Sequence, residues 1–208
     1  MRRIECFRNH IYEFESDKNL SKKILNNLLT IEWVDNNYNS LSKTNTLYEL
    51  EEFHEIHIWF IKCLKEVIFD LRLEIPNIVI AQSWANKTLN SQSHHEHAHP
   101  NSFISGVFYL SSSEDEDGGQ ISFYNEATPI WYKSPFLLTK IDQFTIKPQI
   151  GKLLVFPSTL HHKVLTSKSN KPRYSIAFNS FPNGIIGSKN TLDYLNIKTE
   201  GFKINDES

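Results

Sequence analysis

Seven short runs of β-branched and aromatic residues occupy the stretch from Ile78 to Asn179, and turn residues rather than helical stretches separate them. The runs cover residues 78–86, 103–110, 120–124, 144–147, 152–156, 162–166 and 173–179. Many short strands without intervening helices are typical of an antiparallel sandwich or jelly roll. We therefore expect a mainly β fold over this part of the chain.

The part of the chain before Pro76 has a helical pattern instead. Apolar residues recur at steps of three and four over residues 20–29, and a longer apolar stripe runs through residues 47–73. We expect residues 1–76 to form an N-terminal helical region that packs on the sheet of a jelly-roll core, residues 77–208, in one compact unit. His54 and His57 lie in the longer helix, and nothing nearby in the sequence completes a metal site, so we interpret them as surface histidines.

Charge and hydropathy exclude several classes of protein. The chain has 22 basic and 24 acidic residues, a net charge of -2, and so lacks the basic excess that a duplex nucleic-acid binder usually carries. No apolar run approaches the roughly 20 residues of a membrane span, so we expect no membrane partner. Cys6 and Cys63 are isolated, which predicts neither a disulfide framework nor a zinc ribbon and favours a reducing, cytoplasmic location.

Four histidines, His94, His95, His97 and His99, lie within six positions just before one of the predicted strands. On an extended strand, residues two apart share a face, so His97 and His99 can reach one metal ion. A third ligand must then come from elsewhere in the chain. His162 is the best candidate, because it begins another predicted strand about sixty residues later.

Two other metal sites are compatible with the same histidines. Residues His95 to His99 satisfy the H-E-x-x-H pattern of zinc metallopeptidases, which works only on a helix, but Pro100 follows at once and the next apolar residues have a strand pattern. A non-catalytic, metal-binding cupin-like module also opens with H-x-H. Its usual glutamate ligand would fall where this chain has Phe103 and Ile104.

The chain resembles the superfamily of 2-oxoglutarate- and Fe(II)-dependent oxygenases, in particular a bacterial and phage group. The resemblance runs in order over roughly half of the chain and rests on six stretches: Trp84 to Asn86, His97 to Ser102, Ser105 to Leu110, Gly119 to Phe123, Gly151 through His162, and Arg173 to Asn179. It implies a double-stranded β-helix of the jelly-roll type, preceded by helices. It also implies an enzyme that uses Fe(II), with 2-oxoglutarate and O2 as cosubstrates, to couple 2-oxoglutarate decarboxylation to the oxidation, most simply the hydroxylation, of a second substrate.

The resemblance also assigns roles to individual residues. His97, His99 and His162 would hold the iron, with no further catalytic residue implied. The common pattern of the superfamily is H-x-D or H-x-E, so Glu96 is an alternative carboxylate ligand. A second group of residues would bind 2-oxoglutarate: Arg173 pairs with its distal carboxylate, and Ser175 and Tyr109 donate to the same group. The prime substrate stays open among peptidyl residues, nucleobases and small metabolites, and no oligomeric state is predicted.

Overall fold

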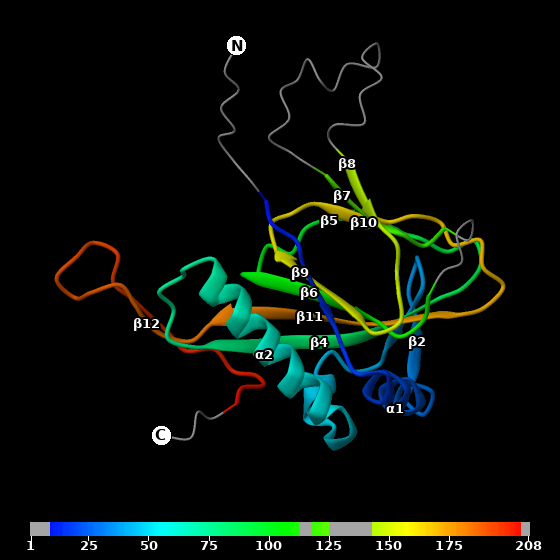
Figure 1. Cartoon of the computed structure of the whole chain (residues 1–208), viewed down its shortest axis with the longest axis horizontal. Helices are drawn as coiled ribbons and strands as arrows, with labels where there is room; N and C mark the ends of the chain where they lie inside the picture. Colours follow the sequence, from blue (N-terminus) through cyan, green and yellow to red (C-terminus); the bar gives the residue numbers. More distant parts are fainter. Residues whose placement is uncertain (1–8, 113–117, 125–142, 205–208) are drawn as a thin grey trace, which may run out of the picture.

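The computed structural model describes residues 9–112, 118–124 and 143–204, and two facing antiparallel sheets form its centre (Figure 1). The larger sheet has seven strands. In spatial order they are β1 (Tyr12–Glu15), β9 (Lys152–Pro157), β6 (Ile104–Tyr109), β11 (Arg173–Pro182), β4 (Ile78–Thr88), β3 (Ser40–Ser42) and β2 (Trp33–Asp35).

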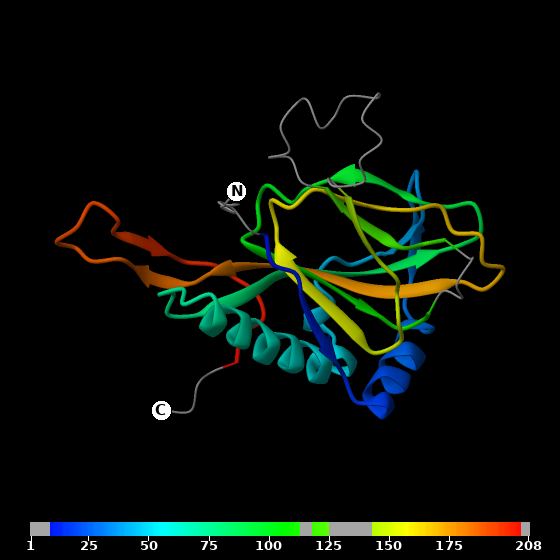
Figure 2. The ribbon, with the colours of Figure 1, turned by 45° about the horizontal axis from the view of Figure 1, so that its top comes forward.

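The smaller sheet lies over one face of the larger one (Figure 1). Its four strands are, in order, β5 (His94–His97), β10 (His162–Val164), β7 (Ile121–Tyr124) and β8 (Gln143–Ile146). A separate hairpin of β12 (Gly184–Ile186) and β13 (Leu195–Ile197) projects from one end of the molecule (Figure 2). The two facing sheets confirm the predicted jelly roll, and each predicted strand from Ile78 to Asn179 is present with small shifts of its ends.

Two helices lie against the other face of the larger sheet (Figure 2). In α1 (Lys18–Leu28) the Asp17 side chain caps the first turn by accepting hydrogen bonds from the N–H groups of Asn19 and Leu20. The turns η1 (Leu47–Glu49) and η2 (Glu51–Phe53) lead into α2 (His54–Asp70). No helix in the described part of the chain is long and apolar enough to cross a bilayer.

The alternation of side chains along each strand divides the interior into two layers. On β6, Phe108 faces the helices and packs on Phe60 of α2, with ring centroids 5.7 Å apart. The next residue, Tyr109, faces the smaller sheet and belongs to a second cluster that includes Phe123 and Phe156. The space between the two sheets therefore receives every second side chain of β4, β6 and β11.

The N-terminal third differs from the sequence prediction in its strands. We predicted only helices there, but β1 pairs with β9 at one edge of the large sheet, and β2 and β3 continue it beyond β4 at the other. The predicted helix over 47–73 begins as an α-helix only at His54. The division at residue 76 into a helical region and a core stays a prediction.

The interpretation of His57 as a surface histidine is wrong. Its side chain is fully buried, with Nδ1 2.7 Å from the carbonyl oxygen of Phe53 and Nε2 2.8 Å from Ser83 Oγ. Burial lowers the pKa of His57 to about 4, so the ring is neutral at physiological pH. His57 therefore ties α2 to β4 as a structural polar contact.

Candidate active site

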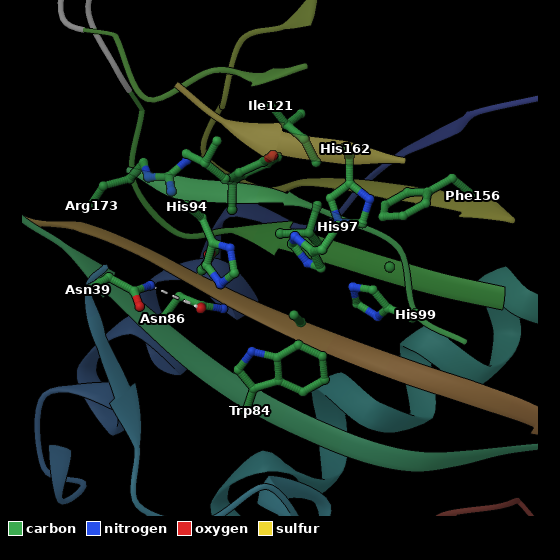
Figure 3. Close-up of a pocket in the computed structure, with 16 residues that line it drawn as sticks. Asn39, Trp84, Asn86, His94, His97, His99, Ile121, Phe156, His162 and Arg173 are labelled. Atoms are coloured by element: carbon green, nitrogen blue, oxygen red, sulfur yellow. Dashed lines mark hydrogen bonds between the residues drawn. The ribbon is translucent and has the colours of Figure 1, made fainter. Parts of the chain in front are cut away.

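Three histidines meet between the two sheets (Figure 3). Pairing of β5 with β10 sets His97 directly opposite His162, and the ring centroids are 4.4 Å apart. His99 follows β5 and is fixed by its backbone N–H, which donates to the carbonyl of Ser158 over 2.8 Å. One ligand nitrogen of each ring lies within 4.8 Å of those of the other two. The structure thus brings together all three residues of the predicted iron site.

Each of these rings is oriented by a hydrogen bond from Nδ1. His97 Nδ1 lies 2.9 Å from the carbonyl oxygen of His95, His162 Nδ1 lies 2.9 Å from that of Leu160, and His99 Nδ1 bonds Asn179 Oδ1. Since carbonyl oxygens only accept, Nδ1 carries the proton in each ring and Nε2 keeps its lone pair. Metal-ligating histidines are typically held by such outer contacts.

The protonation state of the three rings also suits metal binding. Burial is the main cause that lowers the pKa of His97 to about 4 and that of His162 to about 3, and it lowers the pKa of His99 as well. Neutral imidazole is the form that ligates a metal ion. The rings are therefore ready to bind without first losing a proton at physiological pH.

A polar network extends behind His99. Asn179 Oδ1 accepts a second hydrogen bond from Ser105 Oγ over 2.8 Å, and the Asn179 amide nitrogen donates to Gln82 Oε1 over 3.2 Å. These contacts fix the orientation of the Asn179 amide, with its oxygen toward His99. The sequence analysis included Asn179 in a matching stretch but gave it no role.

A bulge in β5 determines which other residues of the histidine cluster face the pocket. Three steps on β5, from His94 to His97, pair with two steps on β10, from Val164 to His162. His94 and His97 therefore both line the pocket, although residues three apart on a regular strand face opposite sides. Glu96, the alternative ligand, does not line it: its side chain is 46% exposed and its carboxylate lies 3.8 Å from His161 Nδ1.

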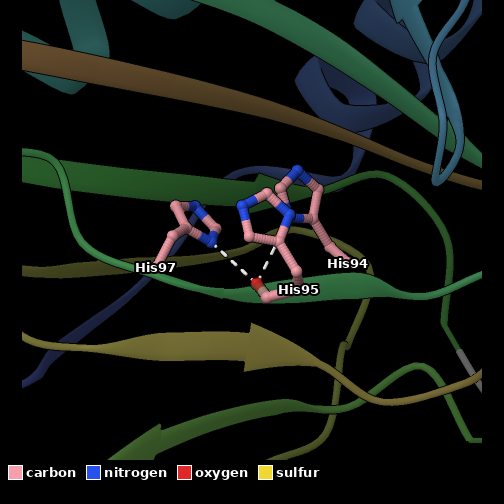
Figure 4. Close-up of side chains that lie close together, drawn as sticks. All are labelled: His94, His95 and His97. Carbon is pink, nitrogen blue, oxygen red and sulfur yellow. Dashed lines mark hydrogen bonds between the residues drawn. The ribbon is translucent and has the colours of Figure 1, made fainter.

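The extended conformation of residues 94–97 also bears on the peptidase alternative. The H-E-x-x-H motif needs a helix to bring its two histidines onto one face, and this segment is a strand. The cluster does contain a second set of histidines, His94, His95 and His97, whose ligand atoms also lie within 4.8 Å of one another (Figure 4). Tyr38 packs on the rings of His94 and His95, with centroid distances of 5.6 Å and 4.6 Å.

The far end of the pocket is formed by a buried arginine. Arg173 is 7% exposed, and its guanidinium donates to the carbonyl of Gly119 over 2.6 Å and to Thr88 Oγ1 over 3.2 Å. Its Nε has no hydrogen-bond partner among the described residues, and no acidic side chain of that part of the chain lines the pocket. A buried charge without an acidic partner is costly, which favours an anionic ligand here.

The other two predicted cosubstrate residues lie beside this arginine. The Arg173 guanidinium is 6.0 Å from the centre of the Tyr109 ring, and Ser175 follows two positions later on β11. Both residues are buried and line the same pocket. Burial raises the pKa of Tyr109 to about 12, so its hydroxyl stays protonated and can donate a hydrogen bond.

Several further residues line the pocket, and the sequence analysis assigned no role to the four with polar side chains: Asn39, Trp84, Asn86 and His94. Trp84 and Asn86 alternate with buried residues on β4, and the Trp84 ring is 6.0 Å from that of His99. Asn39 comes from the turn before β3, more than forty residues away in the chain. Only the pairing of β3 with β4 brings it here, a contact that no local pattern reveals.

Comparison with known proteins agrees with this geometry. Residues 82–179 match the model of the family described as "Putative 2OG-Fe(II) oxygenase". Over this segment, just under half of the chain, the protein is similar to the 2OG-Fe(II) oxygenases. The segment contains the three histidines and Arg173, and enzymes of this family use Fe(II), 2-oxoglutarate and O2, as predicted. None of the curated protein sequences compared with the chain is a significant match.

Solved structures show that the fold of this chain is shared. HygX from Streptomyces hygroscopicus, with nickel, 2-oxoglutarate and hygromycin B bound, is 11% identical, has a TM-score of 0.62, and aligns over 84% of this chain and 83% of its own. A Pseudomonas putida prolyl-4-hydroxylase is 15% identical, with a TM-score of 0.56 and 85% and 89% of the two chains covered. A Trichoplax adhaerens prolyl hydroxylase, in complex with a hypoxia inducible factor peptide, is 15% identical with a TM-score of 0.59, covering 83% of each chain.

Proposed function

We propose that this oxygenase holds Fe(II) with His97, His99 and His162, and binds 2-oxoglutarate between that site and Arg173. In the proposed reaction, decarboxylation of 2-oxoglutarate accompanies oxidation, most simply hydroxylation, of a C–H bond in a second substrate by O2. One observation carries this proposal. The same pocket contains three imidazoles with free Nε2 atoms and a buried arginine that has no acidic partner among the described residues.

The three histidines fit Fe(II) by donor type and by number. Imidazole nitrogen suits iron, and three protein ligands leave coordination positions open for a cosubstrate and oxygen. When bound, the iron supplies the activation of O2, and the protein supplies positioning and exclusion of water. The Nδ1 contacts to His95, Leu160 and Asn179 hold the rings so that the same nitrogen of each remains available.

Arg173 fits the distal carboxylate of 2-oxoglutarate. Its Nε is the buried donor without a partner, and a carboxylate oxygen would complete it with a charge-assisted hydrogen bond. Ser175 and the protonated Tyr109 supply neighbouring hydroxyl donors for the same group. The apolar side chains of Ile121, Phe156 and Val164 line the rest of this wall and keep water from the bound cosubstrate.

The proposal also covers the location of the protein and the classes of its prime substrate. We propose a cytoplasmic protein, which is supported by a free, buried Cys63. Of the similar structures above, one has hygromycin B bound and another is in complex with a hypoxia inducible factor peptide. Peptidyl residues, nucleobases and small metabolites are therefore all retained as classes of prime substrate at this stage.

The test is turnover and binding by the purified protein and two variants. Protein with Fe(II) should convert 2-oxoglutarate to succinate, slowly without a prime substrate, with O2 consumed. His162→Ala should lose stoichiometric Fe(II), and Arg173→Ala should keep Fe(II) but lose 2-oxoglutarate affinity. His10→Ala is the matched control, because His10 is an exposed histidine that does not line the pocket. Absence of succinate, or 2-oxoglutarate affinity indifferent to Arg173, contradicts the proposal.

A further inference from the structure

One side of the pocket is used neither by the iron site nor by the cosubstrate site. It is formed by Asn39 from the β2–β3 turn and by Trp84 and Asn86 from β4, and it lies across the cavity from His162 (Figure 3). The Asn39 amide nitrogen donates to Asn86 Oδ1 over 3.3 Å. The two side chains thus form an amide pair that faces the reaction centre.

The amide pair contains a buried acceptor without a partner. Among the described residues, two buried side-chain polar atoms lack a hydrogen bond, and these are Asn39 Oδ1 and Arg173 Nε. Both belong to residues that line this one pocket, and Asn39 is 3% exposed. Buried polar groups are rarely left unsatisfied in native structures, so each of the two marks a position where a ligand atom is expected.

The two orphan atoms require different ligands. At neutral pH, 2-oxoglutarate has two carboxylates and a ketone, all of which only accept hydrogen bonds. It can therefore complement the Arg173 donor but not Asn39 Oδ1, which needs an N–H or O–H group. A donor group on a second ligand would satisfy this acceptor.

The charge of this second ligand follows from the lining. The described residues around the pocket include no aspartate or glutamate, so an ammonium group would be buried without a counter-ion. A carboxylate or phosphate would instead set its lone pairs against those of Asn39 Oδ1. An uncharged donor avoids both costs.

Asn39 is held in place before any ligand arrives. Its carbonyl accepts a hydrogen bond from the Asn36 N–H over 2.8 Å, which closes the turn. The following residues, Ser40 and Leu41, pair with Lys87 and Asn86 of β4. The acceptor is therefore preorganised, as specific recognition of a substrate requires.

We propose that Asn39 and Asn86 bind the prime substrate, and that this substrate presents an uncharged hydrogen-bond donor, a hydroxyl or a carboxamide N–H, to Asn39 Oδ1. This inference rests on the proposed function, because it takes the second ligand of the pocket to be the molecule that is oxidised. Trp84, beside His99, supplies an apolar surface for the carbon skeleton next to the donor.

The test compares probes of one shape on protein loaded with 2-oxoglutarate and Zn(II), a diamagnetic substitute for Fe(II). The five probes are cyclopentane rings bearing a carboxamide, hydroxymethyl, methyl ketone, carboxylate or aminomethyl group, and saturation-transfer NMR gives their dissociation constants. The carboxamide, the hydroxymethyl probe or both should bind about tenfold more tightly than the ketone, which has no donor, and than the carboxylate. The probe that binds tightly distinguishes an amide from a hydroxyl substrate. Equal binding of the ketone overturns the inference.

Variants of the turn then assign the effect to one side chain. Asn39→Leu should weaken the favoured probe about tenfold and change 2-oxoglutarate affinity less than about twofold. Asn37→Leu, an exposed asparagine of the same turn, is the matched control. Asn39→Asp should gain affinity for the aminomethyl probe, a result that a merely unfolded hairpin cannot produce. Unchanged probe affinity in Asn39→Leu, or no gain in Asn39→Asp, contradicts the assignment.

The same titrations separate this inference from the proposed function. If Arg173→Leu does not reduce 2-oxoglutarate affinity, the proposed function fails. If Arg173→Leu does reduce 2-oxoglutarate affinity but Asn39→Leu leaves the affinity for the probes unchanged, only the substrate inference fails.

Discussion

The orientation of the three histidine rings is determined by residues that lie behind them and would not contact the metal. Asn179, Leu160 and His95 each accept a hydrogen bond from one imidazole Nδ1–H, and so determine which nitrogen of that ring is free. Two of the acceptors are backbone carbonyls, which substitution leaves in place. Asn179 is the exception, because it acts through its side chain.

Asn179→Leu should weaken Fe(II) binding about 10- to 100-fold, since His99 loses the acceptor that orients it. Asn179→Asp should retain most of the affinity, because a carboxylate oxygen also accepts from Nδ1. Anaerobic titration with Fe(II) measures both, and Gln82→Ala, which removes only the outer partner of Asn179, is the control. Equal loss in the leucine and aspartate variants would contradict an orienting role.

His57 provides a prediction about pH and stability. Its pKa is about 4 in the folded protein against an ordinary 6.5, so the unfolded chain takes up a proton first as the pH falls. Below pH 6.5 the free energy of unfolding should therefore decrease, by about 1.4 kcal/mol per pH unit from this residue, until about pH 4. Urea unfolding from pH 7 to pH 4 should show a shallower decrease in His57→Gln. Parallel pH profiles for the two proteins would refute this account.

The strands and helices differ in how well the sequence predicted them. The seven strands predicted from Ile78 to Asn179 were found because composition and turn residues are local signals, but β5 (His94–His97) was not among them. Strands β1, β2 and β3 have only three or four residues each. β1 and β3 are extended because they pair with the distant strands β9 and β4, and β2 pairs with β3. The structure brings His97, His99 and His162 together as the sequence analysis expected, and their role as metal ligands stays a prediction. The inward turn of His94 depends on a bulge defined by β10.

Gly106 on β6 leaves room for the ring of Phe178 on the neighbouring strand β11. A Cβ at this position would lie 2.3 Å from Cζ of Phe178, the residue opposite on β11. Gly106→Ala should therefore lower the free energy of unfolding by about 1–3 kcal/mol through overpacking. Denaturant unfolding measures this, and Phe178→Leu in the Gly106→Ala background should be less destabilising than in the wild type. Simple additivity of the two substitutions would show that the ring is not the obstacle.

At the scale of the whole molecule, stability and function occupy different layers. The layer between α2 and the large sheet is apolar and closed by contacts such as Phe60 on Phe178, 4.9 Å apart. The layer between the sheets holds the histidines, Arg173 and the amide pair, with two polar atoms that no described residue satisfies. These unsatisfied atoms lower the stability of the ligand-free protein, and we expect ligands that hydrogen-bond to them to restore it.

Binding of the metal and cosubstrate should therefore stabilise the protein. With 2-oxoglutarate at 100 times its dissociation constant, linkage predicts about 2.7 kcal/mol of added stability. Arg173→Met should lose this gain. Without ligand, the variant should be within about 1 kcal/mol of the wild type in stability, because the substitution removes a buried charge along with its hydrogen bonds. Thermal unfolding with and without 2-oxoglutarate measures both. An equal ligand-induced shift in the variant would rule out Arg173 as the anchor.

Asn39 lies outside the segment, residues 82–179, that matches the oxygenase family. The residues proposed to hold iron and cosubstrate all lie within that one segment, while the acceptor proposed to select the substrate lies in a four-residue turn elsewhere in the chain. Such a division lets specificity evolve without disturbing the chemistry. Exchanging residues 36–39 alone should then be enough to redirect the enzyme to a different substrate.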